Sequence, residues 1–398
     1  MESLSIGWQV AACRFRRHVL TVVCLIGACL VAAPLVADSI ERVEVQRKGN
    51  LLHLEGRVLV EGQDGSLLLQ TRDGMIWVLS AEEVQSRKAL KSPFEPLDAK
   101  ALGDRLLEQL PAGFQVRTTD HYVIAFNTSE AYARWCSTLL ERLYRAYFRF
   151  WEKRGLELHE PEFPLPVVIF DDQRGYAEFS RDELGEATSA VIGYYNFRTN
   201  HMVMFDLTGL AQASRTRRRR FSSTQIRQLL AQPGSERNVA TIVHEATHQL
   251  AYNTGLQTRY AVTPFWLAEG LAIYFESPDL KNGTGWRTIG RVNRYRLREF
   301  QSNLRHRPTN RLEQLLTDDS LFRSSKTGGA AYADAWALTY YLIRKRPKDF
   351  VAYLREFSKL QPLENLSAQQ RLRQFRKYFG SDLEELDRAV IRYMSRLR

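Results

Sequence analysis

Residues 241–250 read TIVHEATHQL and contain the pattern His-Glu-x-x-His. Side chains four residues apart share one face of a helix, so His244 and His248 can offer their imidazoles to a single metal ion. Glu245 then reaches a water molecule at that ion, where a carboxylate acts as a general base. The stretch therefore predicts a helix that carries two of the ligands of a metal site.

Glu269 is the candidate for a third ligand. Catalytic zinc sites use three protein ligands and leave the fourth position to water, which the metal acidifies to a pKa near ~7. Residues 264–271 read PFWLAEGL, and Thr263 as a cap with Pro264 at the first position predicts a second helix there. Gly270 allows the two helices to approach each other closely. The expected cofactor is one Zn2+ ion held by His244, His248 and Glu269.

Other side chains compete for the third ligand position. Ala251 and Thr254 stand where the metzincin form of the pattern needs Gly and His, so that class is excluded. Glu276 lies two helical turns beyond Glu269, about 10 Å along the axis, and cannot share one ion with it. His201 remains as an alternative ligand outside the two helices.

Composition places the chain among globular proteins. Its 398 residues fit one large domain or two of ordinary size. The 56 Lys and Arg residues against 45 Asp and Glu residues give a net charge of +11, and a basic run from Arg215 to Arg220 supplies much of the excess. This run reads as a solvated loop, with an acidic partner, an anionic lipid head group or a nicking site as alternatives. No aromatic residues interleave with the arginines, so no nucleic acid is expected as a partner.

The first 37 residues read as an export segment. Three arginines precede an apolar run over residues 19–37, and small residues before Asp38 resemble a cleavage site. The run is also long enough for a membrane anchor, and Cys29 in the box Ile-Gly-Ala-Cys looks like the modified cysteine of a bacterial lipoprotein. Each interpretation predicts an exported protein of the periplasm or cell envelope. Only Cys136 follows this segment, so no disulfide is expected and Cys136 reads as a buried apolar side chain.

Residues 38–90 predict a small antiparallel β module. Short apolar runs are separated by turn signals, among them Asp-Gly pairs at 64–65 and 73–74. Residues 91–112 follow as a linker with a short helix near 102–110. The remaining chain, 113–398, predicts one larger domain that is helical from about residue 318.

The larger domain combines strands with helices, so the predicted fold class is α+β. Strands are expected over 121–126 and 165–170, and a hairpin joins 190–197 to 201–206. Amphipathic helices are expected over 129–154 and 235–253, the second with Ser235 as N-cap and Gly255 as stop signal. The C-terminal arginines are expected to be solvated, on helices over 330–344, 349–360, 368–379 and 383–397.

The two motif stretches together resemble the gluzincin metallopeptidases of the thermolysin and aminopeptidase N kind. In those enzymes a Trp-Leu-x-Glu-Gly segment, here Trp266 to Gly270, supplies the third zinc ligand. The region 121–386 is similar to peptidase MA-like domains of unknown function in exported bacterial proteins. The resemblance implies a mixed β-sheet, zinc-binding helices, and Glu245 as the general base. The chain lacks the Gly-x-Met-Glu-Asn segment with which aminopeptidase N grips a substrate's amino terminus, so an endopeptidase is expected.

Two further roles concern the substrate. Gluzincins commonly stabilise the reaction's oxyanion with a Tyr or His beyond the third ligand, and Tyr332 at the start of a predicted helix is the candidate. A tyrosine of the core or rim is the alternative for this residue. Asp334, in the same turn, could orient a metal ligand. The resemblance also implies that an extended peptide pairs with the hairpin strand that contains Gly193, Tyr194 and Tyr195.

These observations predict an exported zinc-dependent metallopeptidase that hydrolyses a peptide or protein substrate. The alternative is a catalytically inactive binding or scaffolding protein of the cell envelope that keeps the same fold. A third hypothesis, less favoured, is a binder of nucleic acid or of anionic surfaces, built on Arg215 to Arg220. Membrane association through residues 19–37 is compatible with each of them.

Overall fold

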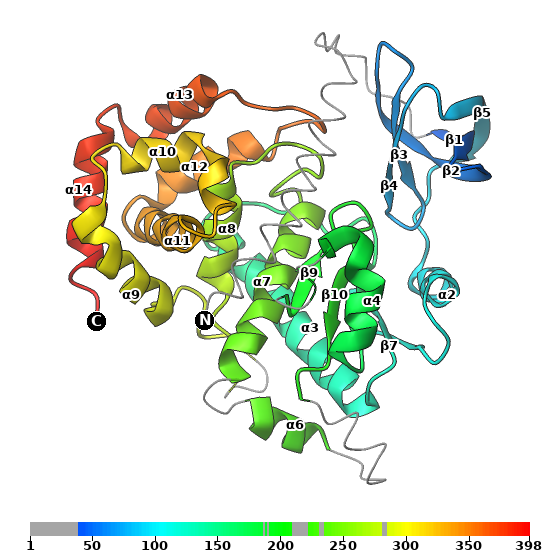
Figure 1. Cartoon of the computed structure of the whole chain (residues 1–398), viewed down its shortest axis with the longest axis horizontal. Helices are drawn as coiled ribbons and strands as arrows, with labels where there is room; N and C mark the ends of the chain where they lie inside the picture. The colour runs from blue at the N-terminus through cyan, green and yellow to red at the C-terminus, as the bar shows by residue number, and fades with distance from the viewer. Residues whose placement is uncertain (1–38, 186–187, 189–190, 209–221, 231–234, 281–284) are drawn as a thin grey trace.

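The computed structural model describes residues 39–398, apart from 186–187, 189–190, 209–221, 231–234 and 281–284. The export segment and the basic run therefore lie outside the described residues. In the described part of the chain, no helix is both long and apolar enough to cross a membrane. Two β-sheets and a set of C-terminal helices make up the fold, which is α+β (Figure 1).

The first sheet is the predicted β module, and it is antiparallel throughout. Gly65 and Gly74 of the two Asp-Gly pairs have positive φ angles, a conformation that glycine adopts without strain. Alternate residues of the strands, such as Val43 and Val45, fill a small core of their own. The strand order is β4-β3-β2-β1-β5, with β1 (Ser39–Arg47), β2 (Asn50–Glu61), β3 (Leu67–Thr71), β4 (Ile76–Leu79) and β5 (Val84–Pro93).

The second sheet is mixed, as the resemblance implied. Its three central strands β7, β8 and β10 are parallel, while β6 and β9 run antiparallel at the two edges. The predicted hairpin is present as β9 and β10, although both strands are shorter than expected. The strand order is β6-β7-β8-β10-β9, with β6 (Gln115–Thr118), β7 (Tyr122–Phe126), β8 (Leu165–Phe170), β9 (Gly193–Tyr195) and β10 (Met202–Phe205).

Helices cover both faces of the second sheet. Tyr122 and Ile124 of β7 point into the larger core, together with α3 (Glu130–Glu152), α6 (Ser223–Leu230) and α7 (Ser235–Asn253). Val123 and Ala125 point into a smaller core that includes α2 (Ala99–Gln109) and α4 (Gln173–Leu184). Because both faces are covered, β8 is buried at every position and reads as one continuous apolar run. Cys136 of α3 is buried as predicted.

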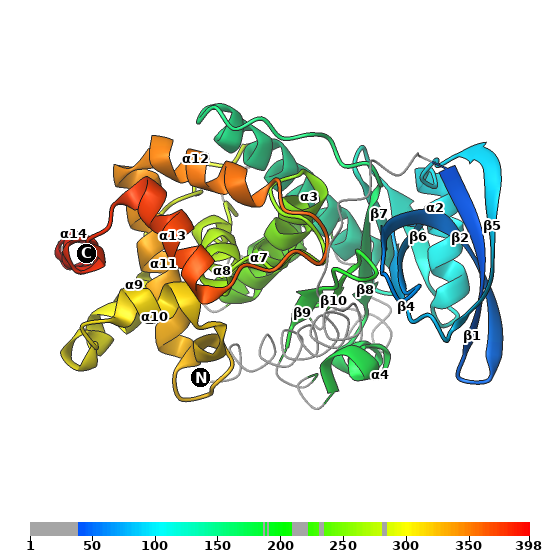
Figure 2. The same ribbon diagram turned by 90° about the horizontal axis from the view of Figure 1, so that it is seen from above.

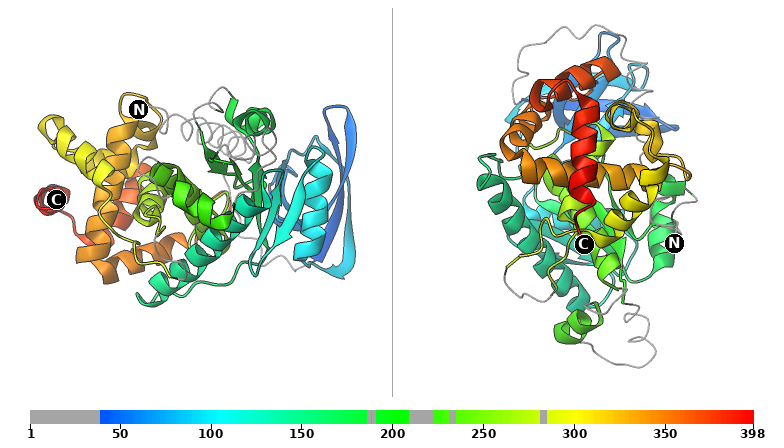
Figure 3. Two further views of the ribbon diagram at one scale, coloured as in Figure 1. Left: turned by 90° about the horizontal axis from the view of Figure 1, so that it is seen from below. Right: turned by 90° about the vertical axis from the view of Figure 1, so that its left-hand side faces the viewer.

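The C-terminal part is helical, as the periodicity predicted. Figures 2 and 3 show these helices at one end of the molecule and the β module at the other, with the metal-motif helices between them. The helices are α8 (Phe265–Phe275), α9 (Arg294–Asn303), α10 (Arg311–Thr317), α11 (Gly328–Lys345), α12 (Pro347–Phe357), α13 (Ala368–Phe379) and α14 (Leu383–Met394). Two short 3-10 helices, Leu304–His306 and Asp319–Phe322, join them.

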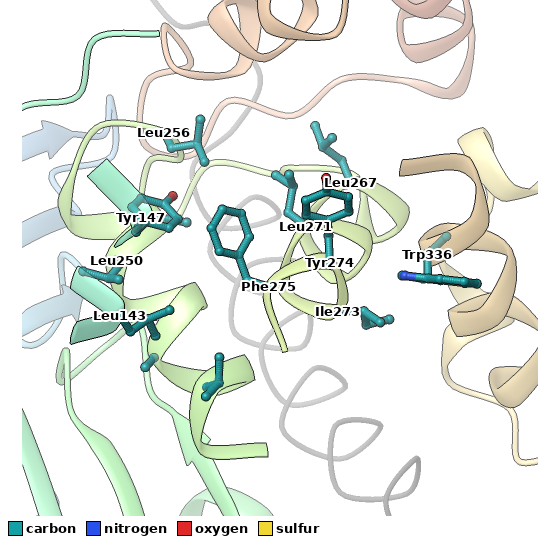
Figure 4. Packing of buried hydrophobic residues seen from close by; sticks show 14 of the residues in the cluster. Leu143, Tyr147, Leu250, Leu256, Leu267, Leu271, Ile273, Tyr274, Phe275 and Trp336 are labelled. Carbon is teal, nitrogen blue, oxygen red and sulfur yellow. The ribbon is translucent and has the colours of Figure 1, made fainter. Parts of the chain in front are cut away.

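Helix α8 is apolar on all sides, and apolar side chains of neighbouring elements pack around it (Figure 4). The ring of Phe275 lies 5.1 Å from that of Tyr147 in α3, measured between centroids. Leu267 and Leu271 are buried, and Trp336 of α11 lies on the opposite side of the helix from α3. The helix that carries Glu269 is therefore packed between α3 and α11.

The start of α8 differs from the prediction. The helix begins at Phe265, and Thr263 makes no capping hydrogen bond. Instead, Oδ1 of Asp319 accepts a bond of 3.1 Å from the backbone N–H of Phe265, and its Oδ2 lies 3.0 Å from Nη1 of Arg371. Asp319 and Arg371 are both buried, so the prediction of solvated C-terminal arginines was wrong at this position. A carboxylate suits this place, because the N-terminus of a helix attracts negative charge.

The close helix contact predicted at Gly270 is present, but the prediction named the wrong partner helix. A Cβ at this position would lie 2.2 Å from Oγ1 of Thr339 and 2.7 Å from the carbonyl oxygen of Ala335, both in α11. Gly270 therefore permits the close approach of α8 to α11, not of α8 to α7. The sequence showed that a close contact was needed but could not show which helix made it.

The β module docks on the turn of the β9–β10 hairpin. The backbone N–H of Ile76 in β4 donates to the carbonyl oxygen of Arg198 over 2.8 Å. Arg259, which is buried, donates to the carbonyl oxygens of Gly74 and Phe197 at 2.7 and 3.3 Å. A small apolar cluster that includes Ile76 and Tyr260 closes the contact.

Gly270→Ala should destabilise the protein by about 1–3 kcal/mol, because the new methyl group overlaps a carbonyl oxygen that cannot move without shifting α11. Chemical denaturation measures the change in the free energy of unfolding. Adding Thr339→Ala to this variant should recover part of the loss, since it removes the closer of the two overlapping oxygens. An unchanged denaturation midpoint for Gly270→Ala would show that the two helices are not in tight contact.

Candidate metal site

The side chains of His244 and His248 in α7 and Glu269 in α8 converge. The two Nε2 atoms are 3.2 Å apart, Nε2 of His244 lies 3.3 Å from Oε2 of Glu269, and Nε2 of His248 lies 3.7 Å from Oε1. A tetrahedral ion with bonds of about 2.0–2.1 Å to nitrogen and oxygen needs ligand atoms about 3.3 Å apart. The three side chains therefore have the spacing of ligands to one tetrahedral ion. Among the described residues, no other group of three His, Cys, Asp or Glu side chains could hold a metal.

The charges of this group favour a cation. All three side chains are buried, and the two oxygens of Glu269 face the Nε2 atoms of His244 and His248. Burial alone would raise the pKa of Glu269, but His248 and His244 outweigh it and hold the pKa at about 2. Burial alone would lower the pKa of His244, but Glu269 and Glu276 raise it to about 10. The site thus contains an ionised carboxylate that retains a positive charge beside it, either a proton or a metal ion.

Glu276 orients the first histidine. Its Oε2 lies 2.9 Å from Nδ1 of His244, and its Oε1 accepts a bond of 2.7 Å from Nδ2 of Asn293. A carboxylate on Nδ1 fixes the imidazole tautomer that leaves Nε2 free for a metal and makes that nitrogen a better ligand. The sequence placed Glu276 too far along α8 to share the ion with Glu269, which agrees with the structure, but this supporting contact was missed. No local pattern could have revealed it, because Glu276 and His244 are 32 residues apart in the sequence.

Glu245 lies between the two histidines in sequence and is completely buried. Its Oε2 accepts a hydrogen bond of 2.9 Å from the backbone N–H of Tyr195 in β9. The next amide, that of Asn196, donates to His201 on the β10 side of the hairpin. Since successive residues of a strand point their amides to opposite sides, the N–H of Tyr195 points away from β10, at the edge where β9 pairs with no other described strand. We call this the free edge of β9, and the candidate general base is placed beside it.

Tyr332 lies in the first turns of α11 and is buried. Burial raises its pKa well above the ordinary value, and the nearby charges of Glu269 and Glu245 act in the same direction, opposed by Arg296. The guanidinium of Arg296 lies 5.3 Å from the centre of the tyrosine ring. The candidate oxyanion donor therefore keeps its proton at neutral pH.

Asp334 does not face the metal group. It is buried between the guanidinium groups of Arg307 and Arg311, with Nε of Arg311 at 2.6 Å from its Oδ2. The prediction that Asp334 could orient a metal ligand was therefore wrong. Its negative charge balances two arginines, of which Arg311 is buried, a role that only the tertiary fold reveals.

The hairpin residues predicted to contact the substrate have different environments. Gly193 lies against β10, where a Cβ would be 3.0 Å from the Cβ of Met204. Tyr194 points into the smaller core, whereas the ring of Tyr195 stacks on Tyr252 of α7 with 5.8 Å between centroids. His201 is not part of the ligand group, and burial lowers its pKa to about 4. Tyr195 contacts Glu245 through its backbone N–H.

Residues 238–364 match the model of a family described as protein of unknown function, DUF1570. The matched segment contains most of α7 and all of α8, and with them the three candidate ligands, Glu245 and Tyr332. It excludes the β module and the second sheet. No curated protein matches the chain. The similarity is thus concentrated on the helices that build the candidate metal site.

Glu276→Gln should weaken metal binding by about 10- to 100-fold, because the amide supports the imidazole of His244 less well than a carboxylate does. Competition with a coloured chelator measures the affinity. Glu299→Gln is the matched control, since Glu299 pairs with Arg296 over 2.9 Å. Equal affinities for the wild type and Glu276→Gln would show that this contact does not support the ligand.

The pKa of His244 predicts a pH dependence of the metal-free protein. Folded His244 keeps its proton up to about pH 10, whereas the unfolded chain loses it near pH 6.5. The stability that this proton contributes is fully present below pH 6.5 and is lost as the pH rises towards 10. A bound metal replaces the proton, so the loaded protein should lose less stability over this range. Thermal denaturation with and without Zn2+ tests this, and parallel pH profiles for the two forms would contradict it.

Proposed function

We propose that the chain is a zinc-dependent metallopeptidase of the gluzincin type. The proposal rests on one observation above all, the convergence of His244, His248 and Glu269 with Glu245 beside them on the same helix. Two imidazoles and one carboxylate form a donor set that suits a catalytic zinc ion with an open position. The resemblance of both motif stretches to gluzincins supports the same assignment.

The residues of the site have complementary roles in this mechanism. Zinc held by the three ligands would acidify the attacking water and polarise the carbonyl of the scissile bond. Glu245 would take the proton of that water and pass it to the nitrogen of the leaving amine. The phenol of Tyr332, kept protonated by burial, would donate a hydrogen bond to the oxyanion. Glu276 would hold the imidazole of His244 in the productive tautomer.

The free edge of β9 provides a place for an extended peptide. Gly193 and Tyr195 are two residues apart, so their backbone groups point to the same side, away from β10. A substrate strand would pair with this edge and pass close to Glu245. The lack of the aminopeptidase N segment favours an endopeptidase, and the first 37 residues favour an exported protein.

Glu245→Gln should retain zinc but lose peptide hydrolysis by about 10²- to 10⁴-fold, because the amide cannot accept the proton of the attacking water. Turnover of a quenched peptide library, with and without a chelator, measures the activity. Glu269→Ala is the companion variant and should lose both zinc and turnover. Unchanged cleavage by Glu245→Gln would refute the mechanism. A wild-type protein that binds zinc and cleaves no peptide would instead support an inactive binding or scaffolding protein.

A further inference from the structure

Helix α7 carries two adjacent rows of polar side chains. The first row holds the ligands His244 and His248, and the second holds Glu245, Gln249 and Asn253. Each row repeats every four residues, so its members lie on one face of the helix. The second row is buried, with exposed fractions of 0%, 0% and 6%. Buried polar side chains require partners, and the sequence alone did not show what these partners were.

All three members of the second row bond to the β9–β10 hairpin. Glu245 accepts the bond from Tyr195 N–H described above. Nε2 of Gln249 donates to the carbonyl oxygens of Asn200 in the hairpin turn and Pro166 in β8, both at 3.0 Å. The side-chain amides of Asn253 and Asn200 donate to each other over 2.7 and 2.9 Å. The row therefore bonds to the hairpin at its strand and at its turn.

Asn200 is the centre of these contacts on the hairpin side. Its Oδ1 also accepts a bond of 2.8 Å from the hydroxyl of Tyr195, so one side chain joins α7, the turn and β9. Its backbone has a φ angle of 64°, a left-handed conformation that asparagine tolerates better than most residues. Asn200 is fully buried, so these bonds are shielded from water.

Strand β9 needs such support because it is only three residues long and, among the described strands, pairs with β10 alone. A short edge strand is held weakly by its own sheet. Catalysis on a bound peptide requires the substrate to be placed within about 1 Å of its productive position. Since the same helix carries the metal ligands, bonds from that helix to the hairpin fix the strand relative to the metal.

We propose that Gln249, Asn253 and Asn200 are positioning residues that fix the free edge of β9 relative to the metal ligands and Glu245. The peptide-binding consequence rests on the proposed function, whereas the fixing of the hairpin rests on the contacts themselves. The side chains of these residues bond to the hairpin and to β8, so they act on the peptide through the strand. Their loss should therefore affect substrate binding and leave metal binding intact.

Asn253→Ala removes the bonds between α7 and the side chain of Asn200. We expect amide exchange of β9 to become about tenfold faster, because roughly one net hydrogen bond is lost. The KM for a cleaved peptide should rise about tenfold with kcat changed less than about threefold, since β9 contacts the peptide before and during the reaction. Zinc affinity should stay unchanged. Tyr195→Phe, which removes only one hydroxyl, gives a milder change in the same direction and serves if Asn253→Ala does not fold.

Thr254→Val is the matched control. Thr254 follows Asn253, is fully buried, and its hydroxyl donates to Leu250 of its own helix rather than to the hairpin. A general loss of stability would change both variants alike, and equal effects on β9 exchange and KM would overturn the proposal. Unchanged β9 exchange in Asn253→Ala, or faster exchange with an unchanged KM, would also overturn it. If the wild type cleaves no peptide, the proposed function fails, while amide exchange still decides whether Asn253 fixes the hairpin.

Discussion

A buried carboxylate is the constraint on which much of this structure depends. Glu269 is 1% exposed, and its two oxygens face the Nε2 atoms of His244 and His248. An ionised group in such a place is stable only when positive charge is held close to it. Either a proton on His244 or a metal ion held by the two imidazoles supplies that charge. Because the imidazoles come from another helix, α7 and α8 must be fixed relative to each other to within a fraction of an ångström.

The C-terminal helices serve this requirement by holding α8. Asp319 caps the start of the helix and is itself fixed by Arg371 of α13. Further along, Gly270 brings the helix against α11, where no larger residue fits. At the end of the helix, Glu276 joins His244 to Asn293, the residue that caps α9. Contacts at its start, its middle and its end thus fix the helix that carries Glu269.

The sequence predicted the elements of this arrangement better than the contacts between them. Apolar periodicity predicted α3, β8 and the C-terminal helices, because each pattern repeats within a few residues. The His-Glu-x-x-His spacing predicted a shared face for the same reason. Contacts between distant residues could not be inferred in this way. Asp319 lies 54 residues from the helix start that it caps, and Asp334 balances arginines instead of facing the metal.

The β module takes part in the same arrangement. The turn of the β9–β10 hairpin lies between two partners, with α7 bonded to Asn200 on one side and β4 bonded to Arg198 on the other. Arg259 follows α7 in the chain, and its buried guanidinium joins the carbonyl oxygens of Gly74 in the module and Phe197 in the hairpin. Burying a charged group among carbonyl oxygens is worthwhile only if the module stays docked. The module is therefore bonded to the hairpin that contains the strand beside Glu245, and we expect that loosening the module also loosens that strand.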